Sequence, residues 1–312
     1  MSRKFIIGQL RYLFRTFPLR RSVRHKAFII VETIRVLVGW LRLRWELRAR
    51  AAPFFDPRET CVVVLLSHNR PQNMHLLVET ALHNSFVTEV IVSNSNREIR
   101  IADWIDAYDN RLTLIDELET TQPGHRLVLA DRSGAAHFLA IDDDILFSPL
   151  QLQEFFACLL GDPEVPHGVT GNLYLPGTIS SNGSPFHHVS AKEREVDVLI
   201  GAYAFTRCHL DRVFTLAKAL GIEKLSGLRN GEDILLSFSG SRPPLIHAIR
   251  PFLCASNSLP GVALWKSVDS FWQEREALYQ KLRAVRLDMS APWHDHREVA
   301  KPVPDFAAPG TP

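Results

Sequence analysis

Short apolar runs alternate with helix-like segments after residue 60. The runs CVVVLLSH (61–68) and VTEVIVSN (87–94) are rich in β-branched residues, and each has the length of one buried strand. Between them lie the turn residues NRPQ and a segment with apolar residues at helical spacing (73–84). This order predicts a parallel βαβ unit, in which a helix packs on a sheet. The helix residues predicted to face the sheet are Leu76, Leu77, Thr80 and Ala81.

The alternation continues with a strand over RLTLID (111–116), a helix over HRLVLADRSG (125–134) and a strand over AHFLAI (136–141). The 312 residues are 46% hydrophobic and 22% charged, which is ordinary for a globular protein with a packed core. The predicted fold class is therefore α/β, with a sheet flanked by helices. The four cysteines form no close pair of the kind that zinc sites use. They are interpreted as reduced core residues, which favours a cytosolic compartment.

Three consecutive aspartates, Asp142, Asp143 and Asp144, directly follow the last of these strands. Open α/β sheets bind ligands beyond the carboxyl ends of their strands, which is where these side chains fall. Adjacent carboxylates repel each other, and a hard cation such as Mn²⁺ or Mg²⁺ would offset the repulsion because it prefers oxygen ligands. Two interpretations remain open at this point: a metal site, or acidic residues in front of a helix that begins at Pro149.

The first 50 residues carry a strong positive charge. They contain 13 Lys or Arg against Glu32 and Glu46, a net charge of +11, whereas the remainder has 23 basic and 32 acidic residues, a net charge of −9. Within them, AFIIVETIRVLVGWL (27–41) repeats apolar residues at helical spacing. The run is too short and too interrupted to span a membrane comfortably. The apolar residues that share one side of the predicted helix are Ile30, Ile34, Leu37 and Leu41.

Residues 1–50 are therefore interpreted as a basic amphipathic segment that lies on an anionic membrane surface. A helix packed on the following domain and an Arg-rich transit peptide are the alternatives. Nucleic acid is not an expected partner, because no recognised binding motif accompanies the charge.

The order of these motifs resembles the metal-dependent GT-A nucleotide-sugar glycosyltransferases, and in particular the exostosin-type enzymes of family 64. Those enzymes have a Tyr-Asn-Arg turn after the first strand, an asparagine after the second, an arginine well before the acidic motif, and a strand that ends in three aspartates. The resemblance implies a GT-A fold, which is a Rossmann-like mixed sheet flanked by helices, over roughly residues 60 to 280. The residues that it assigns to binding the nucleotide-sugar are Asn69, Arg70, Asn94, Arg126, Asp142, Asp143 and, from a later motif, Asn230.

The resemblance continues into the second half of the chain. The segment VDVLIGAYAFTRCHLDRVF (196–214) is similar to one that walls the acceptor and sugar site, and RNGEDILLSF (229–238) is similar to an Asn-Cys-Glu-Asp-Ile motif with Gly231 in place of cysteine. FWQEREAL (271–278) is similar to a C-terminal helix with a Glu-Arg pair. The chain departs from the family at residues expected to contact base and ribose, because it has Ser67-His68 for Thr-Tyr and His125 for Asn.

The chemistry of sugar transfer explains the acidic residues. Departure of a sugar diphosphate concentrates negative charge on the β-phosphate, and a cation held by Asp144 together with Asp142 would stabilise that charge. Asp233 and Glu232 would supply the carboxylate across the sugar, as a general base in an inverting enzyme or a charge stabiliser in a retaining one. Capping of a helix that begins near Asn230 is the alternative for this motif.

Arg275, carried over from the family, would bind the diphosphate from the other side of the metal. Its alternative role is a surface ion pair with Glu274 or Glu276. His187 and His188 lie in a predicted loop and are not assigned a role. The histidines considered as a third metal ligand are His247, His294 and His296.

The expected function is a metal-dependent hexosyltransferase that uses Mn²⁺ or Mg²⁺, takes a UDP-sugar donor, and acts with retention on a glycan or lipid-linked acceptor. The alternatives are an inverting GT-A enzyme of the bacterial synthase-like family and a non-catalytic GT-A-like binding protein. A nucleotidyltransferase is less favoured, because LLSHNRPQN lacks a Gly-rich phosphate loop.

The expected organisation is a basic amphipathic helical extension (1–56), a GT-A domain (57–290) and a loosely ordered tail (291–312). Reduced cysteines and the lack of a recognisable signal peptide predict a cytoplasmic, peripherally membrane-associated protein. A Golgi type II membrane protein is the alternative location.

Overall fold

The computed structural model describes residues 23–46, 55–254, 264–266 and 268–288, together with the single residues 7 and 53. The predicted tail (291–312) and most of the first 22 residues lie outside the described residues. The division into an extension, a domain and a tail therefore stays a prediction.

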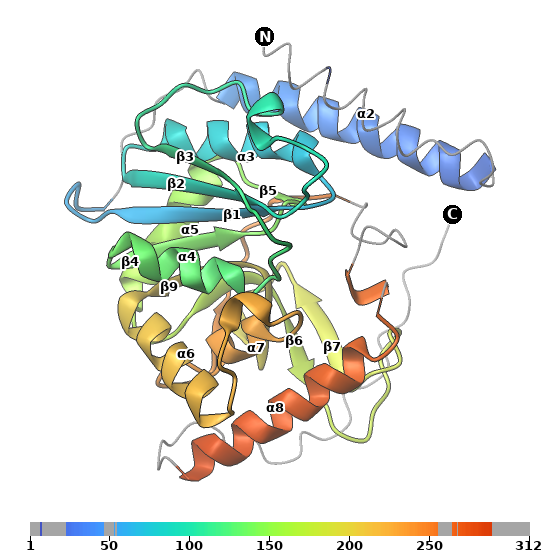
Figure 1. The fold of residues 1–312 in the computed structure, drawn as a ribbon, viewed down its shortest axis with the longest axis vertical. Helices are drawn as coiled ribbons and strands as arrows, with labels where there is room; N and C mark the ends of the chain where they lie inside the picture. The colour runs from blue at the N-terminus through green and yellow to red at the C-terminus, as the bar shows by residue number, and fades with distance from the viewer. Residues whose placement is uncertain are drawn as a thin grey trace.

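A mixed nine-stranded sheet forms the centre of the molecule, with helices on both of its faces (Figure 1). The main path of the sheet runs through β3 (Leu112–Asp116), β2 (Val87–Asn94), β1 (Cys61–Ser67), β4 (His137–Ile141), β9 (Val198–Thr206), β6 (His167–Tyr174), β10 (Leu245–Ile246) and β8 (Arg194–Glu195). Strand β7 (Phe186–Ser190) pairs with β6, and β5 (Ile145–Leu146) pairs with β11 (Phe252–Leu253) in a separate two-stranded sheet. The predicted α/β class, a mixed sheet flanked by helices, is confirmed.

The first four strands of the path are parallel, and β9 then runs antiparallel to both β4 and β6. The parallel strands are those predicted from the apolar runs, and each begins or ends within one residue of its expected position. The helices are α2 (Val23–Glu46), α3 (Pro71–His83), α4 (His125–Ser133), α5 (Pro149–Gly161), α6 (Arg207–Ala219), α7 (Glu232–Ser237) and α8 (Phe271–Asp288). Short 3₁₀ turns span Ile101–Asp103, Leu225–Gly227 and Leu264–Lys266.

Strand β1 is apolar on both faces because each face is covered. Val63 and Leu65 pack in the core that contains α3 and α5, whereas Val62 and Val64 pack in the core that contains α4, α6, α7 and α8. Successive side chains of a strand point to opposite faces, so an unbroken apolar run fits a parallel strand buried on both sides. The four residues of α3 predicted to face the sheet are all buried.

Helix α5 begins at Pro149, as the alternative interpretation of the three aspartates predicted. Ser148 caps it, because its Oγ accepts the Gln151 N–H while the Gln151 side chain accepts the Ser148 N–H. The helix therefore satisfies its first turn without the aspartates, which leaves the acidic residues free for other contacts.

Helix α2 packs on the domain through a side other than the apolar side noted in the sequence. Val36 is buried in the core that contains α3, and Leu37 packs against it, but Ile30, Ile34 and Leu41 are exposed. Among the described residues, no helix is both long and apolar enough to cross a membrane.

Two smaller expectations need correction. Cys61 and Cys254 are buried and all four cysteines are free, but Cys208 is exposed rather than in the core. His187 and His188 lie in strand β7, not in a loop.

Candidate active site

A cavity of about 860 Å³ opens at the carboxyl ends of β1 and β4. Its walls come from the loops after these two strands, from β9, and from the starts of α7 and α8. Parallel strands end at the same edge of a sheet, which is why residues far apart in the chain meet here. The predicted site residues that line the cavity are Asn69, Arg70, Arg126, Asp142, Asp143, Asp144, Asn230, Glu232, Asp233 and Arg275.

The three aspartates form a turn between β4 and β5. The Asp142 N–H donates to the Gly201 carbonyl at 2.7 Å, and the Ile145 N–H donates back to the Asp142 carbonyl at 3.2 Å. Gly201 has a φ of +75°, and a Cβ there would lie 2.5 Å from Ile145 Cδ1, so the turn requires a glycine at this position of β9. Because the chain turns at Asp142, strand alternation stops and all three aspartates face the cavity.

Two buried arginines are the positive partners of this turn. Arg70 forms ion pairs with Asp143 and with Asp144, the latter at 3.2 Å. Arg126 donates to Asp142 Oδ1 at 2.6 Å and lies over the Tyr203 ring, 5.2 Å from its centroid. Charged groups buried as pairs lose water but gain attraction at low dielectric.

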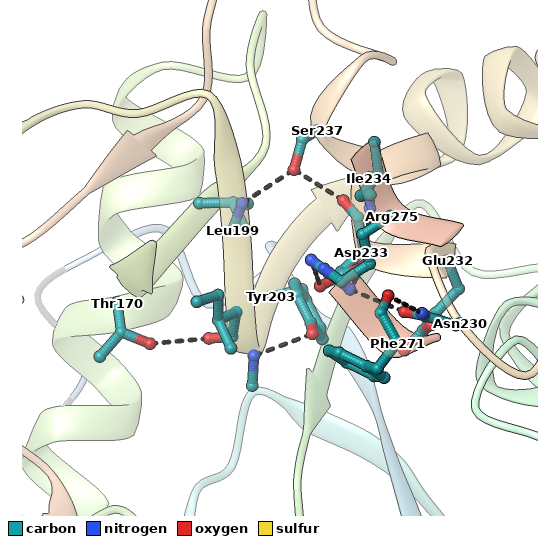
Figure 2. A network of polar contacts seen from close by, with 12 residues as sticks. Thr170, Leu199, Tyr203, Asn230, Glu232, Asp233, Ile234, Ser237, Phe271 and Arg275 are labelled. Atoms are coloured by element: carbon teal, nitrogen blue, oxygen red, sulfur yellow. Dashed lines mark hydrogen bonds and ion pairs between the residues drawn. The ribbon is translucent and has the colours of Figure 1, made fainter. Parts of the chain in front are cut away.

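A second buried ion pair joins α7 to α8 on the opposite wall. Figure 2 shows Arg275 directed at Asp233 and Asn230. The two guanidinium Nη atoms donate to the Asp233 oxygens at 2.9 and 2.6 Å, and Nη1 also donates to Asn230 Oδ1 at 3.1 Å. Neither expected surface pair of Arg275 is present, because Glu274 pairs with Arg229 at 2.8 Å and Glu276 accepts from Tyr174 at 3.0 Å.

The capping alternative for the Asn-Gly-Glu-Asp motif is not observed. The Asn230 amide donates to the Phe271 carbonyl at 2.8 Å, and its Oδ1 accepts from Arg275 rather than from an N–H of α7. Gly231 occupies the N-cap without a side-chain hydrogen bond. Gly231 has a φ of +100°, and a Cβ there would lie 2.3 Å from Leu278 Cδ2. This close approach explains why the chain has glycine where the resembling motif has cysteine.

The cavity holds more negative than positive charge. Five carboxylates line it, from Asp142–Asp144, Glu232 and Asp233, against the three buried guanidinium groups described above. Arg229 also reaches the wall, but it pairs with Glu274. The cavity therefore has two more carboxylates than buried guanidinium groups.

The pKa is raised for three of these carboxylates, Asp143, Asp144 and Glu232, and burial is the largest cause for each. Burial raises the pKa of Asp144 to about 7, because the loss of water outweighs the attraction of Arg70. Burial also raises the pKa of Glu232 to about 7, and the adjacent Asp233 charge adds to the rise. The nearest cation to Glu232 is Arg126, whose Nη2 lies 3.8 Å from Oε1. The ligand-free cavity therefore holds two acidic groups that bind protons near neutral pH or accept another cation.

Asn94 is the predicted site residue that the structure does not bring to the cavity. Its amide donates to the carbonyls of Asn96 and Ile99 at 3.1 and 3.0 Å and to Asp116 Oδ1 at 2.8 Å. These contacts hold the loop after β2 together, so Asn94 shapes the edge of the site indirectly.

None of the three histidines considered as a third metal ligand lies in the cavity among the residues that the structure describes. His247 is buried against His167, with 2.7 Å between the ring nitrogens, and it does not line the cavity. His294 and His296 lie outside the described residues. Within the ranges that the structure covers, no group of three or more His, Cys, Asp or Glu side chains is arranged to hold a metal ion by itself.

Several lining residues were missed in the sequence. Tyr203, from β9, accepts the Gly201 N–H at 2.8 Å and supports Arg126 with its ring. Phe271 and Trp272 line the cavity from the first turn of α8. Their spacing of three or four residues from Arg275 places them on neighbouring helix positions, a signal that could have found them.

Comparisons with known proteins found distant likenesses among solved structures. No family model matches the chain, and no curated protein matches it. A crystal structure of GalNAc-T7 with UDP, GalNAc and Mn²⁺ is similar, with a TM-score of 0.45 and 11% identity over 61% of this chain and 42% of that chain. A CMP:2-keto-3-deoxy-manno-octonic acid synthetase complexed with CTP has a TM-score of 0.35 and 14% identity over 54% of this chain and 84% of that chain. These TM-scores are low, and the function proposed below rests on the residues of this chain.

Proposed function

We propose that the protein is a metal-dependent GT-A glycosyltransferase that transfers a sugar from a UDP-sugar to a glycan or lipid-linked acceptor. The observation that carries the proposal is the excess of two carboxylates over buried arginines in one cavity at the carboxyl ends of parallel strands. A nucleoside diphosphate alone would add negative charge to a cavity that already has an excess of negative charge. A nucleoside diphosphate together with a divalent cation fits both the charge and the position.

The carboxylate oxygens that line the cavity suit a hard cation. Asp142 and Asp144 offer carboxylate oxygens to the cavity, and two carboxylates with substrate phosphate oxygens are a common ligand set for Mg²⁺ and Mn²⁺. Such a set needs no third protein ligand. When bound, the ion would act as a Lewis acid on the diphosphate oxygens.

The buried arginines have positioning roles in this proposal. Arg70 and Arg126 hold the aspartate turn through ion pairs, so that the carboxylates are in place before a ligand arrives. Arg275 is engaged with Asp233, and we therefore assign it to positioning Asp233 rather than to direct contact with the diphosphate.

Glu232 is the carboxylate best placed for the reaction. Asp233 is neutralised by Arg275 and accepts the Ile234 N–H at 2.9 Å, whereas Glu232 has only the more distant Arg126. A carboxyl with a pKa of about 7 can hold or release a proton near neutral pH. This property favours a general base, as the inverting alternative requires; the resemblance to the exostosin-type enzymes favours retention. Proton NMR of the anomeric product at early times separates the two.

Calorimetric titration of UDP-sugars, with and without Mn²⁺, tests the proposal. The wild type should bind a UDP-sugar only with the metal, and Asp144→Asn should lose at least about tenfold in affinity, since it removes a charged ligand. Glu232→Gln should keep donor binding and lose transfer. A matched control is Asp131→Asn, because Asp131 pairs with Arg207 on the surface away from the cavity. If UDP-sugars bind equally well without metal and to Asp144→Asn, the metal-dependent assignment is wrong; if none binds at all, donor binding itself is wrong.

A further inference from the structure

One side of α2 is anchored on the domain. Val36 is 4% exposed, and Glu32 and Thr33 are also buried. The Arg35 guanidinium lies 5.5 Å from the centroid of the Phe252 ring. Figure 1 shows α2 as a long blue helix beside α3 at one end of the molecule. These contacts fix which side of the helix faces away from the protein.

The opposite side of α2 is a continuous apolar surface. Successive members recur every three or four residues, apart from one adjacent pair, so they share one face of the helix. Surface helices of globular proteins normally bury such a face and expose a polar one. The residues of this apolar stripe, with their exposed fractions, are Ile30 (40%), Val31 (55%), Ile34 (54%), Val38 (59%), Leu41 (59%) and Trp45 (74%).

We propose that the apolar stripe of α2 docks on an anionic lipid surface. The stripe provides apolar area, and the basic residues of the same segment provide attraction to lipid headgroups. Residues 1–50 carry a net charge of +11, and α2 itself has five Lys or Arg against Glu32 and Glu46. Tryptophan is favoured at the membrane interface, where Trp45 would lie at one end of the stripe.

The charge also selects among possible occupants of the stripe. A second copy of the chain would bring another segment with a charge of +11 against the first. An anionic lipid surface attracts each Lys or Arg near it, and salt screens this attraction. The lipid is therefore the occupant whose chemistry matches both the apolar stripe and its charge. This inference is independent of the proposed reaction.

Flotation with vesicles tests the docking surface. The full chain should float with vesicles of phosphatidylcholine and phosphatidylglycerol, float less with phosphatidylcholine alone, and be released by salt. The variant Ile34→Asp/Val38→Asp should lose at least about tenfold in partition, because two apolar side chains no longer enter the interface. The control Ile179→Asp makes the same change at another exposed site, 81% exposed, and should behave as the wild type.

Three further outcomes decide between the lipid surface and its alternatives. The double variant should melt at the wild-type temperature, since both side chains are exposed; a large fall would show that the stripe is part of the fold and would overturn the proposal. Wild-type flotation of the double variant would overturn it as well. A wild-type dimer that dissociates in the double variant, with no vesicle binding by either, would replace the lipid with a second copy of the chain.

Discussion

Asp144→Asn is the most direct test of the charge balance in the cavity. Burial raises the pKa of Asp144 from 3.8 to about 7 in the folded protein. At about 1.36 kcal/mol per pKa unit, keeping this group ionised costs the folded state on the order of 4 kcal/mol above pH 7. Asparagine cannot ionise, so the ligand-free variant should be more stable than the wild type by up to about this amount at about pH 8.

The gain should depend on pH with a definite sign. A carboxyl with a raised folded pKa binds more protons in the folded than in the unfolded state between the two pKa values, so the wild type gains stability as the pH falls from about 7 toward 4. The advantage of the variant should shrink to about 2 kcal/mol near pH 5. Urea denaturation of the metal-free protein at both pH values measures the difference.

The opposite result would refute the reasoning. If Arg70 neutralised Asp144 fully, Asp144→Asn would break a buried ion pair and destabilise the protein, by about 3–5 kcal/mol in typical cases. Asp131→Asn provides the control, because the Asp131 side chain is 50% exposed and its ion pair should contribute less than about 1 kcal/mol. A stabilised Asp144→Asn that no longer binds donor would show that the charge is retained for ligand binding at the expense of stability.

Asp233→Asn should have the opposite effect and destabilise the protein by about 3–5 kcal/mol in urea denaturation, because it leaves a guanidinium buried without its counter-charge; unchanged stability would contradict the ion pair. Gly201→Ala should lower the melting temperature more than Gly177→Ala, since both glycines have positive φ but only the first places a Cβ within 2.5 Å of another side chain; equal losses would mean that backbone strain alone matters. Binding of Mn²⁺ with UDP should release protons near pH 7, because Asp144 and Glu232 ionise when the cation arrives. Titration in buffers of different ionisation enthalpy measures the release, and a heat independent of buffer would contradict it.

The sequence predicted the parallel half of the sheet well, because its signal is local. Strands β1 and β2 are rich in β-branched residues, and the apolar run of β1 fits its burial on both faces. The helix between them shows the 3.6-residue period in its own residues. Pattern and structure therefore agree over Cys61–Asn94.

The partners inside the site were much harder to predict. Arg70 and Asp143 are 73 residues apart, and Asp233 and Arg275 are 42 apart, so their pairing depends on how whole elements meet. The sequence analysis named all four residues but expected them to contact the substrates rather than one another.

Helix α2 was predicted only in part from the sequence. Its apolar period was recognised, yet periodicity has no direction: it shows that apolar residues share a side, and not whether that side faces a core or the solvent. The contacts of Val36 and Arg35 decide the direction, and they lie in residues that pattern alone gave no special weight. The cytoplasmic location stays a prediction.

The ion pairs of the aspartate turn have a consequence for the order in which ligands bind. A cation that arrives alone must compete with Arg70 for Asp144, and a nucleotide that arrives alone meets surplus negative charge. Each ligand removes the obstacle to the other, so their affinities should be coupled, and the coupling must be equal in both directions. For the proposed metal and nucleotide, we therefore expect each ligand to bind more tightly when the other is present.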